Sequence, residues 1–199
     1  SVLGNGNYDF TLGFRNAFSY KNLSMSVLVD MKFGADVYSM SKMQSHVNGT
    51  SKETLEGREG WYASEQARLS ANVDAKDWTP TGGYVGKGVK AVTDADGNVS
   101  YVPNDVYVDP AKYWQALQNS SPEPFICDNS FVKLREVSLS YSCPKKWFVH
   151  TPIESVTLSA YGRNLLLIYS KVDNIDPESS YNNGNGQGFE YGSLPSRRT

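Results

Sequence analysis

The feature that most constrains the fold is a long alternation of apolar and polar residues at positions 23–34. Every second side chain in this run is apolar, and the residues between them are small or polar except Leu28. A period of two places successive side chains on opposite faces of an extended strand. The apolar row consists of Leu23, Met25, Val27, Val29, Met31 and Phe33. At roughly 3.3 Å per residue the run spans about 40 Å, which is more than a tilted strand needs to cross a bilayer.

Three further segments repeat this alternation. The first lies at 10–20 and is separated from the run at 23–34 by Lys21 and Asn22, the length of a two-residue hairpin loop. The others lie at 131–142 and 154–167. A soluble β-sandwich with one face on its core shows the same pattern. Strand length and connection length therefore have to distinguish the two folds.

The connections between the four segments alternate in length. A two-residue turn follows the first segment, and a modest turn at 143–153 follows the third. Nearly a hundred residues, about 35–130, follow the second, and a loop at about 168–197 follows the fourth. Outer-membrane barrels have this asymmetry, with short periplasmic turns and long extracellular loops. The sequence therefore predicts an all-β fold, a section of a transmembrane antiparallel β-barrel with two long extracellular loops.

Charge and composition exclude several other classes. The formal net charge of −2 provides no basic surface, so we expect no nucleic-acid partner. No run of 18 apolar residues is present, so we expect no transmembrane helix. Cys127 and Cys143 flank the segment at 131–142, and an extended strand holds its ends too far apart for a disulfide.

The long connection at about 35–130 requires structure of its own. Residues 60–71 are rich in helix formers. A second helix is predicted over 109–117, because Asp109 is a good N-cap and Pro110 suits the first helical position. Between the two helices, residues 94–98 predict a hairpin turn between valine-rich flanks.

No motif in the chain indicates catalysis. Asp173, Asp176 and Glu178 could bind a cation, but a solvated acidic loop is the better interpretation. His46 and His150 are isolated, and no Ser/His/Asp grouping is evident from spacing. The sequence predicts no enzyme, no catalytic residue, no metal site and no cofactor.

Aromatic residues are concentrated in the long connection. We predict that they contact a ligand or a partner by stacking on sugar rings or packing on another protein. The alternative is that half or more of them form the core of the connection itself. The candidate contact residues are Trp61, Tyr62, Trp78, Tyr84 and Trp114.

Several phrases together resemble one family. The run from Phe125 to Tyr141 is similar to the "F-[IL]-K-L-R-E-[IV]-[ST]-L-[ST]-Y" strand of SusC/RagA-type TonB-linked (TonB-dependent) outer-membrane transporters. Shorter matching phrases occur in the order expected for the C-terminal region of that family, at Phe18–Asn22, Gly60–Tyr62, Gly162–Leu165, Asp176–Glu178 and Gly192–Thr199. The resemblance covers nearly the whole chain.

The resemblance implies the C-terminal portion of a 22-stranded barrel in the outer membrane of a gram-negative cell. Such transporters are driven by the TonB complex and pair with a SusD-like surface lipoprotein. They import oligosaccharides or, in some members, peptides. We expect the family's plug domain, TonB box and final strand to be absent from residues 1–199.

The same implication places the apolar row from Leu23 to Phe33 against membrane lipid, with Ser24, Ser26, Asp30 and Lys32 facing the lumen. Two alternatives remain open at this point. One is a secreted soluble β-rich glycan-binding module. The other is a passive barrel or a structural outer-membrane protein.

Overall fold

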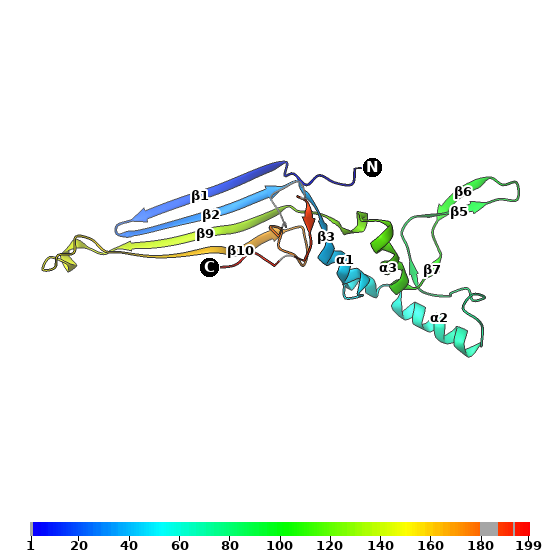
Figure 1. Ribbon diagram of the computed structural model, residues 1–199. Coiled ribbons are helices and arrows are strands. Elements are labelled where there is room, and N and C mark those ends of the chain that lie inside the picture. The colour runs from blue at the N-terminus through cyan, green and yellow to red at the C-terminus, as the bar shows by residue number, and fades with distance from the viewer. Residues whose placement is uncertain (1, 180–186, 193) are drawn as a thin grey trace. The chain divides into compact units, whose positions relative to one another are not determined.

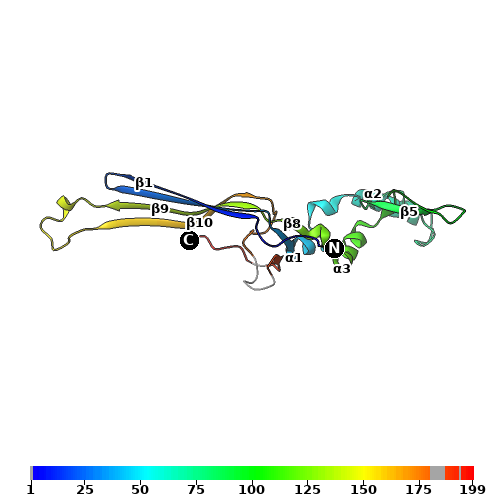
Figure 2. The same cartoon turned by 90° about the horizontal axis from the view of Figure 1, so that it is seen from above.

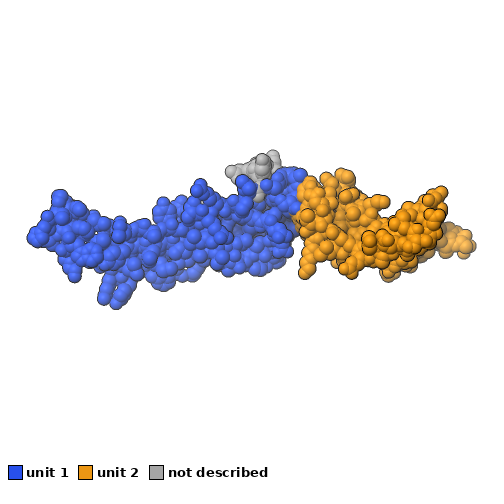
Figure 3. Space-filling view, turned by 90° about the horizontal axis from the view of Figure 1, so that it is seen from below, with its two compact units in different colours: residues 1–41, 125–199 blue, residues 42–124 orange. Residues whose placement is uncertain are grey.

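The protein, described by a computed structural model, divides into two compact units (Figures 1 and 3). Unit 1 comprises residues 1–41 and 125–199, and unit 2 comprises residues 42–124. The described residues are 2–179, 187–192 and 194–199. Parts of the loop expected at about 168–197 and of the phrase Gly192–Thr199 lie outside them. None of the described helices is long and apolar enough to cross a membrane.

Unit 1 is built on a four-stranded antiparallel sheet in the order β1-β2-β9-β10 (Figure 1). The strands are β1 Phe10–Tyr20, β2 Leu23–Phe33, β9 Phe131–Ser142 and β10 Thr157–Ser170. The two-residue turn between β1 and β2 lies beside the start of the β9–β10 connection, since Asn22 Nδ2 donates to the Ser142 carbonyl at 2.6 Å. Both short connections are therefore at one end of the sheet, and both long ones leave from the other.

The two faces of this sheet differ in chemistry. Its register places Leu23 opposite both Tyr20 and Tyr141, so the apolar rows of neighbouring strands share one face. This face is uncovered, and the side chains of Phe18 and Leu158 are 61 % and 64 % exposed. Hydroxyl pairs cross the other face at 2.7–3.1 Å, at Ser19–Ser24, Ser26–Ser138 and Ser140–Ser159.

A bulge in β9 changes the phase of its alternation. The pairing of β2 with β9 shifts between Leu28 and Val29, which lie opposite Glu136 and Leu134. Arg135 is the extra residue at this shift, and it binds Asp30 of the polar face. A bulge leaves an extra residue in one strand and can redirect a side chain. The basic side chain therefore joins the polar face instead of standing in the apolar row.

The structure corrects the predicted bounds of the fourth strand, which was expected at 154–167. β10 begins at Thr157, which pairs with Ser142, and the preceding Val156 carbonyl accepts the Cys143 N–H at 2.8 Å. Irregularities after Arg163 and Leu167 keep the strand paired with β9, so that it reaches Ser170. The chain end lies beside β10 (Figure 2), and Arg163 and Thr199 exchange backbone N–H···O bonds, the pattern of an antiparallel pair.

A second sheet in unit 1 includes both ends of the long connection. It has the order β11-β3-β8, with β3 Asp36–Ser39, β8 Ile126–Asp128 and β11 Phe189–Glu190. Cys127 lies within β8 and Cys143 follows β9, and no disulfide joins these two described residues. The expectation of one loop over 35–130 was too broad, because pairing between Asp36 and Asp128 fixes both of its ends in unit 1.

Unit 2 contains the helices and the hairpin expected in the long connection, together with further short helices and strands. The expected helices are α2 Arg58–Ser70 and α3 Pro110–Ser120, and Asp109 caps α3 by accepting the Ala111 N–H at 2.9 Å. The turn at 94–98 joins β5 Val89–Thr93 to β6 Val99–Pro103, as predicted. The elements that were not predicted are α1 Met40–Val47, which begins at the end of unit 1, the 3-10 turn Lys52–Leu55, β4 Tyr84–Val85 and β7 Tyr107–Val108.

Candidate functional site

Unit 2 contains a cavity of about 610 Å³ whose wall includes three of the five predicted contact residues. They are Trp61 and Tyr62 from α2 and Trp114 from α3. The remaining wall comes from the end of α1, the segment after it, Arg58 and Glu65 of α2, and the first half of α3. This volume falls within the range of about 300–1,000 Å³ that small-molecule sites occupy.

Local backbone geometry places these aromatic residues. α2 begins after Gly57, which has a φ of 79°, and a Cβ there would lie 2.5 Å from the Gly83 carbonyl carbon. Glycine is therefore the residue that fits at position 57. The helix begins at the next residue, which places Trp61 and Tyr62 in its first turn and a half. The Asp109 cap sets the start of α3 in the same way, and Trp114 follows one turn later.

Trp114 and Tyr84 belong to the core of unit 2, since each is 7 % exposed. The Trp114 ring lies 4.6 Å from that of His46, 5.3 Å from Tyr113 and 5.7 Å from Tyr84, measured between centroids. Tyr84 does not line the cavity, and burial raises the pKa of its hydroxyl. Part of the predicted contact set is thus the connection's own core, as the alternative interpretation expected.

Trp78 lies in the segment after α2 and contacts that helix away from the cavity wall. Its Nε1 donates to the Ser64 hydroxyl at 3.1 Å, and the Thr81 N–H donates to the same oxygen at 3.0 Å. These bonds attach the segment after α2 to the helix, and Trp78 does not contribute to the cavity wall. The structure therefore brings Trp61, Tyr62 and Trp114 together and leaves Trp78 apart.

His46, which the sequence shows as isolated, is part of the cavity wall. The ring has oxygen neighbours at both nitrogens, with Nδ1 2.8 Å from the Lys42 carbonyl and Nε2 2.8 Å from the Glu53 carboxylate. The hydrogen bond from His46 lowers the pKa of Glu53. Sequence spacing could not reveal this pair, because the intervening turn brings the two side chains together.

The charged groups of the cavity wall are bonded within the chain. Arg58 donates to the Gly49 and Thr54 carbonyls at 2.7 Å each. Glu65 accepts two hydrogen bonds from Arg68 at 2.9 and 3.0 Å, and Asp109 accepts the helix N–H already described. In contrast, the buried Trp114 Nε1 has no hydrogen-bond partner among the described residues.

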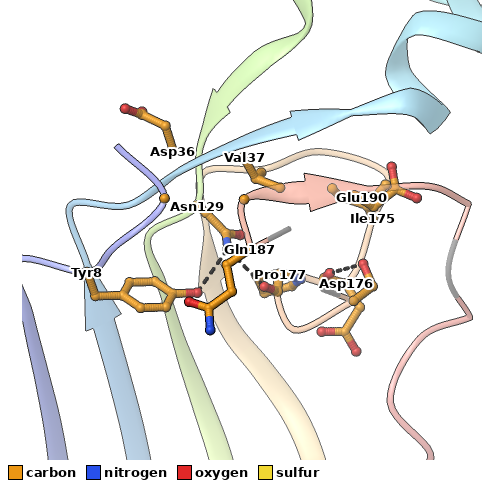
Figure 4. A pocket seen from close by; sticks show the side chains of 12 residues that line it. Tyr8, Asp36, Val37, Asn129, Ile175, Asp176, Pro177, Gln187 and Glu190 are labelled. Carbon is orange, nitrogen blue, oxygen red and sulfur yellow. Dashed lines mark hydrogen bonds between the residues drawn. The ribbon is translucent and has the colours of Figure 1, made fainter. Parts of the chain in front are cut away.

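Unit 1 has a smaller polar pocket of about 190 Å³ (Figure 4). Asn129 stands in its wall, and its Nδ2 donates to the Tyr8 hydroxyl at 2.9 Å and to the Pro177 carbonyl at 3.0 Å. Burial and the nearby Glu178 carboxylate raise the pKa of Tyr8 to about 12. The contacts of Asn129 hold the segment around Pro177 to the beginning of β9.

An ion cluster continues this attachment across the polar face of the sheet. Lys133 Nζ lies 2.8 Å from Glu178, 3.4 Å from Asp176 and 2.6 Å from the Ser196 hydroxyl. Arg135 binds Asp30, Glu178 and the Asn164 side chain. Lys133 and Arg135 thus link β9 to Asp176, Glu178 and Ser196.

Asp173, Asp176 and Glu178 were interpreted as a solvated acidic loop. Asp173 is exposed, but the interpretation was wrong for Asp176 and Glu178, whose side chains are 10 % and 19 % exposed. Burial opposes ionisation of both carboxyls, yet hydrogen bonds outweigh it and lower each pKa. For Glu178 these bonds come from Arg135 and Lys133, and for Asp176 chiefly from Ser196. The two basic side chains come from a strand more than forty residues away, which sequence spacing could not show.

We predict that strong acid weakens this attachment. The folded-state pKa values of Asp176 and Glu178 lie below those of the unfolded chain, roughly 4. Their stabilising contribution is therefore complete above about pH 5 and is lost as pH falls through the folded-state values. Hydrogen exchange of the Ser196 amide, which donates to Asp176 at 2.8 Å, should lose protection below about pH 4.

The control for this measurement is the Lys171 amide, which donates to the Ser130 carbonyl at 3.0 Å. A carbonyl does not titrate, so its protection should change less over the same interval. Equal loss of protection at both amides would show general acid unfolding and contradict the prediction.

Comparison with known proteins connects this architecture to a class of receptors. No protein-family model matches the chain. TonB-dependent receptors P3 and P26 of Formosa agariphila are 26 % and 28 % identical over 204 and 203 residues, which cover the whole chain. The chain spans 16 % and 17 % of the length of these curated relatives.

Solved structures of the RagAB peptide importer share the fold. The closed-closed state aligns with 99 % of the chain and 17 % of the solved chain, at a TM-score of 0.58 and 16 % identity. A further RagAB transporter structure aligns with 97 % of the chain and 16 % of the solved chain, at a TM-score of 0.53 and 16 % identity. These findings confirm the resemblance to SusC/RagA-type TonB-dependent receptors and the fold expected for a section of their barrel.

Proposed function

Because the chain resembles TonB-dependent receptors along its whole length, we propose that it forms part of the wall and the extracellular loops of an outer-membrane nutrient importer. The observation that carries the proposal is the two-faced sheet of unit 1. Its long strands have an uncovered apolar face and a polar face joined by hydroxyl pairs and ion pairs. Lipid covers the first face, and the lumen lies against the second.

In this proposal the apolar row from Leu23 to Phe33 contacts lipid. The short connections after β1 and β9 are periplasmic, and the long connections are extracellular. Residues 1–199 act as a partial barrel domain of a longer receptor. The plug domain, the TonB box that couples to the TonB complex and the final strand belong to other parts of that receptor.

The proposed partners follow from the resemblance. RagAB is a peptide importer, and SusC-like receptors work with a SusD-like surface lipoprotein that closes the barrel. We propose such a lipoprotein as the partner and an oligosaccharide or a peptide as the cargo. The role is transport and not enzymatic catalysis. A secreted soluble module is less favoured, because the apolar face of the sheet would then be exposed to water.

We predict that deleting the segment from Trp61 to Trp78 impairs nutrient uptake or lipoprotein binding without preventing barrel assembly. The segment belongs to unit 2, whereas the long strands belong to unit 1. Uptake of labelled cargo, co-purification of the lipoprotein and heat-modifiable mobility on gels measure the three properties. Shortening the exposed turn at 94–98 is the control deletion. Unchanged uptake and lipoprotein binding after the larger deletion would contradict the proposed role of this connection.

A further inference from the structure

We infer that the cavity of unit 2 is a binding site for one neutral sugar ring and that it discriminates against sugars carrying a carboxylate. The inference deepens the proposed function, on which it rests for the extracellular position of the cavity. The binding chemistry itself rests on Trp61, Tyr62 and Trp114, on the bonded charges around them and on one buried donor without a partner.

The aromatic wall suits a ring with an apolar face. Trp61 is partly exposed, and Tyr62, 66 % exposed, lies beside it on α2. Large exposed aromatic side chains at a cavity lose apolar contact with water when a flat ligand covers them. The C–H face of a pyranose ring is such a surface, while its hydroxyl edge remains available for hydrogen bonds. The partly exposed Trp61 and the exposed Tyr62 therefore favour stacking of one ring.

The electrostatics of the cavity favour a neutral ligand. Arg58 has short hydrogen bonds to backbone carbonyls, and Glu65 and Asp109 accept hydrogen bonds from the chain. A carboxylate entering the cavity would have to compete with these bonds for Arg58 and would approach two carboxylates. Burying a charge without a partner is costly. A neutral hydroxylated ring avoids this cost.

Trp114 supplies the second, independent observation. The residue is 7 % exposed, lines the cavity and has an indole N–H without a hydrogen-bond partner among the described residues. Indole nitrogen is a donor only, and a buried donor without an acceptor is unfavourable. Hydroxyl and ring oxygens of a sugar are acceptors, and one of them would satisfy this donor once the side chains that cover the indole nitrogen move aside. A purely hydrocarbon ligand has no acceptor and could not satisfy the indole N–H.

The test uses the receptor that carries this chain, purified in detergent, and isothermal titration with single-ring probes. The neutral probes are methyl glycosides of glucose, galactose, mannose and xylose. The charged probes are methyl glucuronide and methyl galacturonide, which match the glucose and galactose probes except for the carboxylate at C6. Tri-alanine represents a peptide ligand. We expect at least one neutral glycoside to bind, and its C6 carboxylate counterpart, where it has one, to bind about tenfold more weakly or not at all.

Three variants locate the binding. Trp61→Ala and Tyr62→Ala remove stacking surfaces and should weaken binding by about fivefold to tenfold. Trp114→Phe keeps an aromatic ring but removes the donor, and should weaken binding about fivefold while the melting temperature changes little. Tyr101→Ala is the matched control, because Tyr101 lies on β6 of the same unit, is 71 % exposed and does not line the cavity. It should change binding less than about twofold.

Several outcomes would overturn the inference. These are equal or tighter binding of the uronides, binding of tri-alanine in place of the glycosides, no binding of any neutral probe, or equal effects of Tyr62→Ala and Tyr101→Ala. Uptake and membrane localisation test the proposed function separately. TonB-dependent uptake without glycoside binding would refute the proposed sugar site in the cavity but not the proposed importer function. Glycoside binding by a protein that does not localise to the membrane would refute the proposed importer function but not the proposed sugar site.

Discussion

Val29→Arg is expected to destabilise the folded receptor in lipid by about 2–4 kcal/mol, the cost of a basic residue near the bilayer midplane on the outer face of a barrel. Val29 lies near the middle of β2 and is paired with Phe14 on one side and Leu134 on the other. An arginine there has no polar side chain at either paired position. Urea unfolding in phospholipid vesicles, followed by the heat-modifiable mobility of the barrel, measures the change in unfolding free energy.

Ser24→Arg provides the control on the opposite face of the same strand. Ser24 is paired with Ser19 and Ser140, which lie on the hydroxyl-rich face. An arginine at this position remains in contact with water in the proposed lumen, so the change in unfolding free energy should stay within about 0.5 kcal/mol. A comparable loss in both variants, or none in Val29→Arg, would argue against lipid contact by the apolar row.

Lys133→Met should cost about 3 kcal/mol, at the low end of the values for breaking a buried ion pair. Lys133 is 4 % exposed and contacts Asp176 and Glu178. Without the ammonium group, the Asp176 carboxylate keeps hydroxyl and backbone donors but has no cation. Glu178 retains Arg135, and this limits the loss. The unfolding assay in vesicles measures the loss of unfolding free energy, and hydrogen exchange of the Ser196 amide reports release of the segments around Asp176 and Ser196 from β9.

Lys171→Met is the matched variant for this prediction. Lys171 Nζ lies 2.6 Å from Asp128, but this pair is much more exposed to solvent than the Lys133 cluster, with side chains 52 % and 38 % exposed. Exposed pairs contribute about 0–1 kcal/mol, so the loss should be much smaller. Adding Asp176→Asn to Lys133→Met should recover part of the stability, because the unpaired carboxylate is then removed. Equal losses for Lys133→Met and Lys171→Met would mean that the cluster does not hold the segment to β9.

Elements that depend on neighbouring residues were predicted correctly from the amino-acid sequence. Period-two alternation identifies a strand because successive side chains must point to opposite faces, and it located β1, β2 and β9. The Asp109–Pro110 helix start and the hairpin turn at 94–98 are equally local, because their hydrogen bonds join residues a few positions apart. The aromatic candidates were also identified by residue type, though not by position in space.

Features that join segments distant in the sequence became visible once the chain was folded. The ion cluster combines Asp30 and two residues of β9 with Asp176, Glu178 and Ser196, and the second sheet pairs β3 with β8 and β11. The bulge at Arg135 left one sign in the sequence, the three-residue spacing between Leu134 and Val137, where strict alternation requires two.

The same limit applies to the cavity. Sequence analysis grouped Tyr84 and Trp78 with the contact residues and left His46 out, whereas packing buried Tyr84, moved Trp78 away and brought His46 into the wall. Alternation and helix caps act through contacts between near neighbours along the chain. Burial of a particular aromatic ring and pairing of a particular charge depend on which distant surfaces meet.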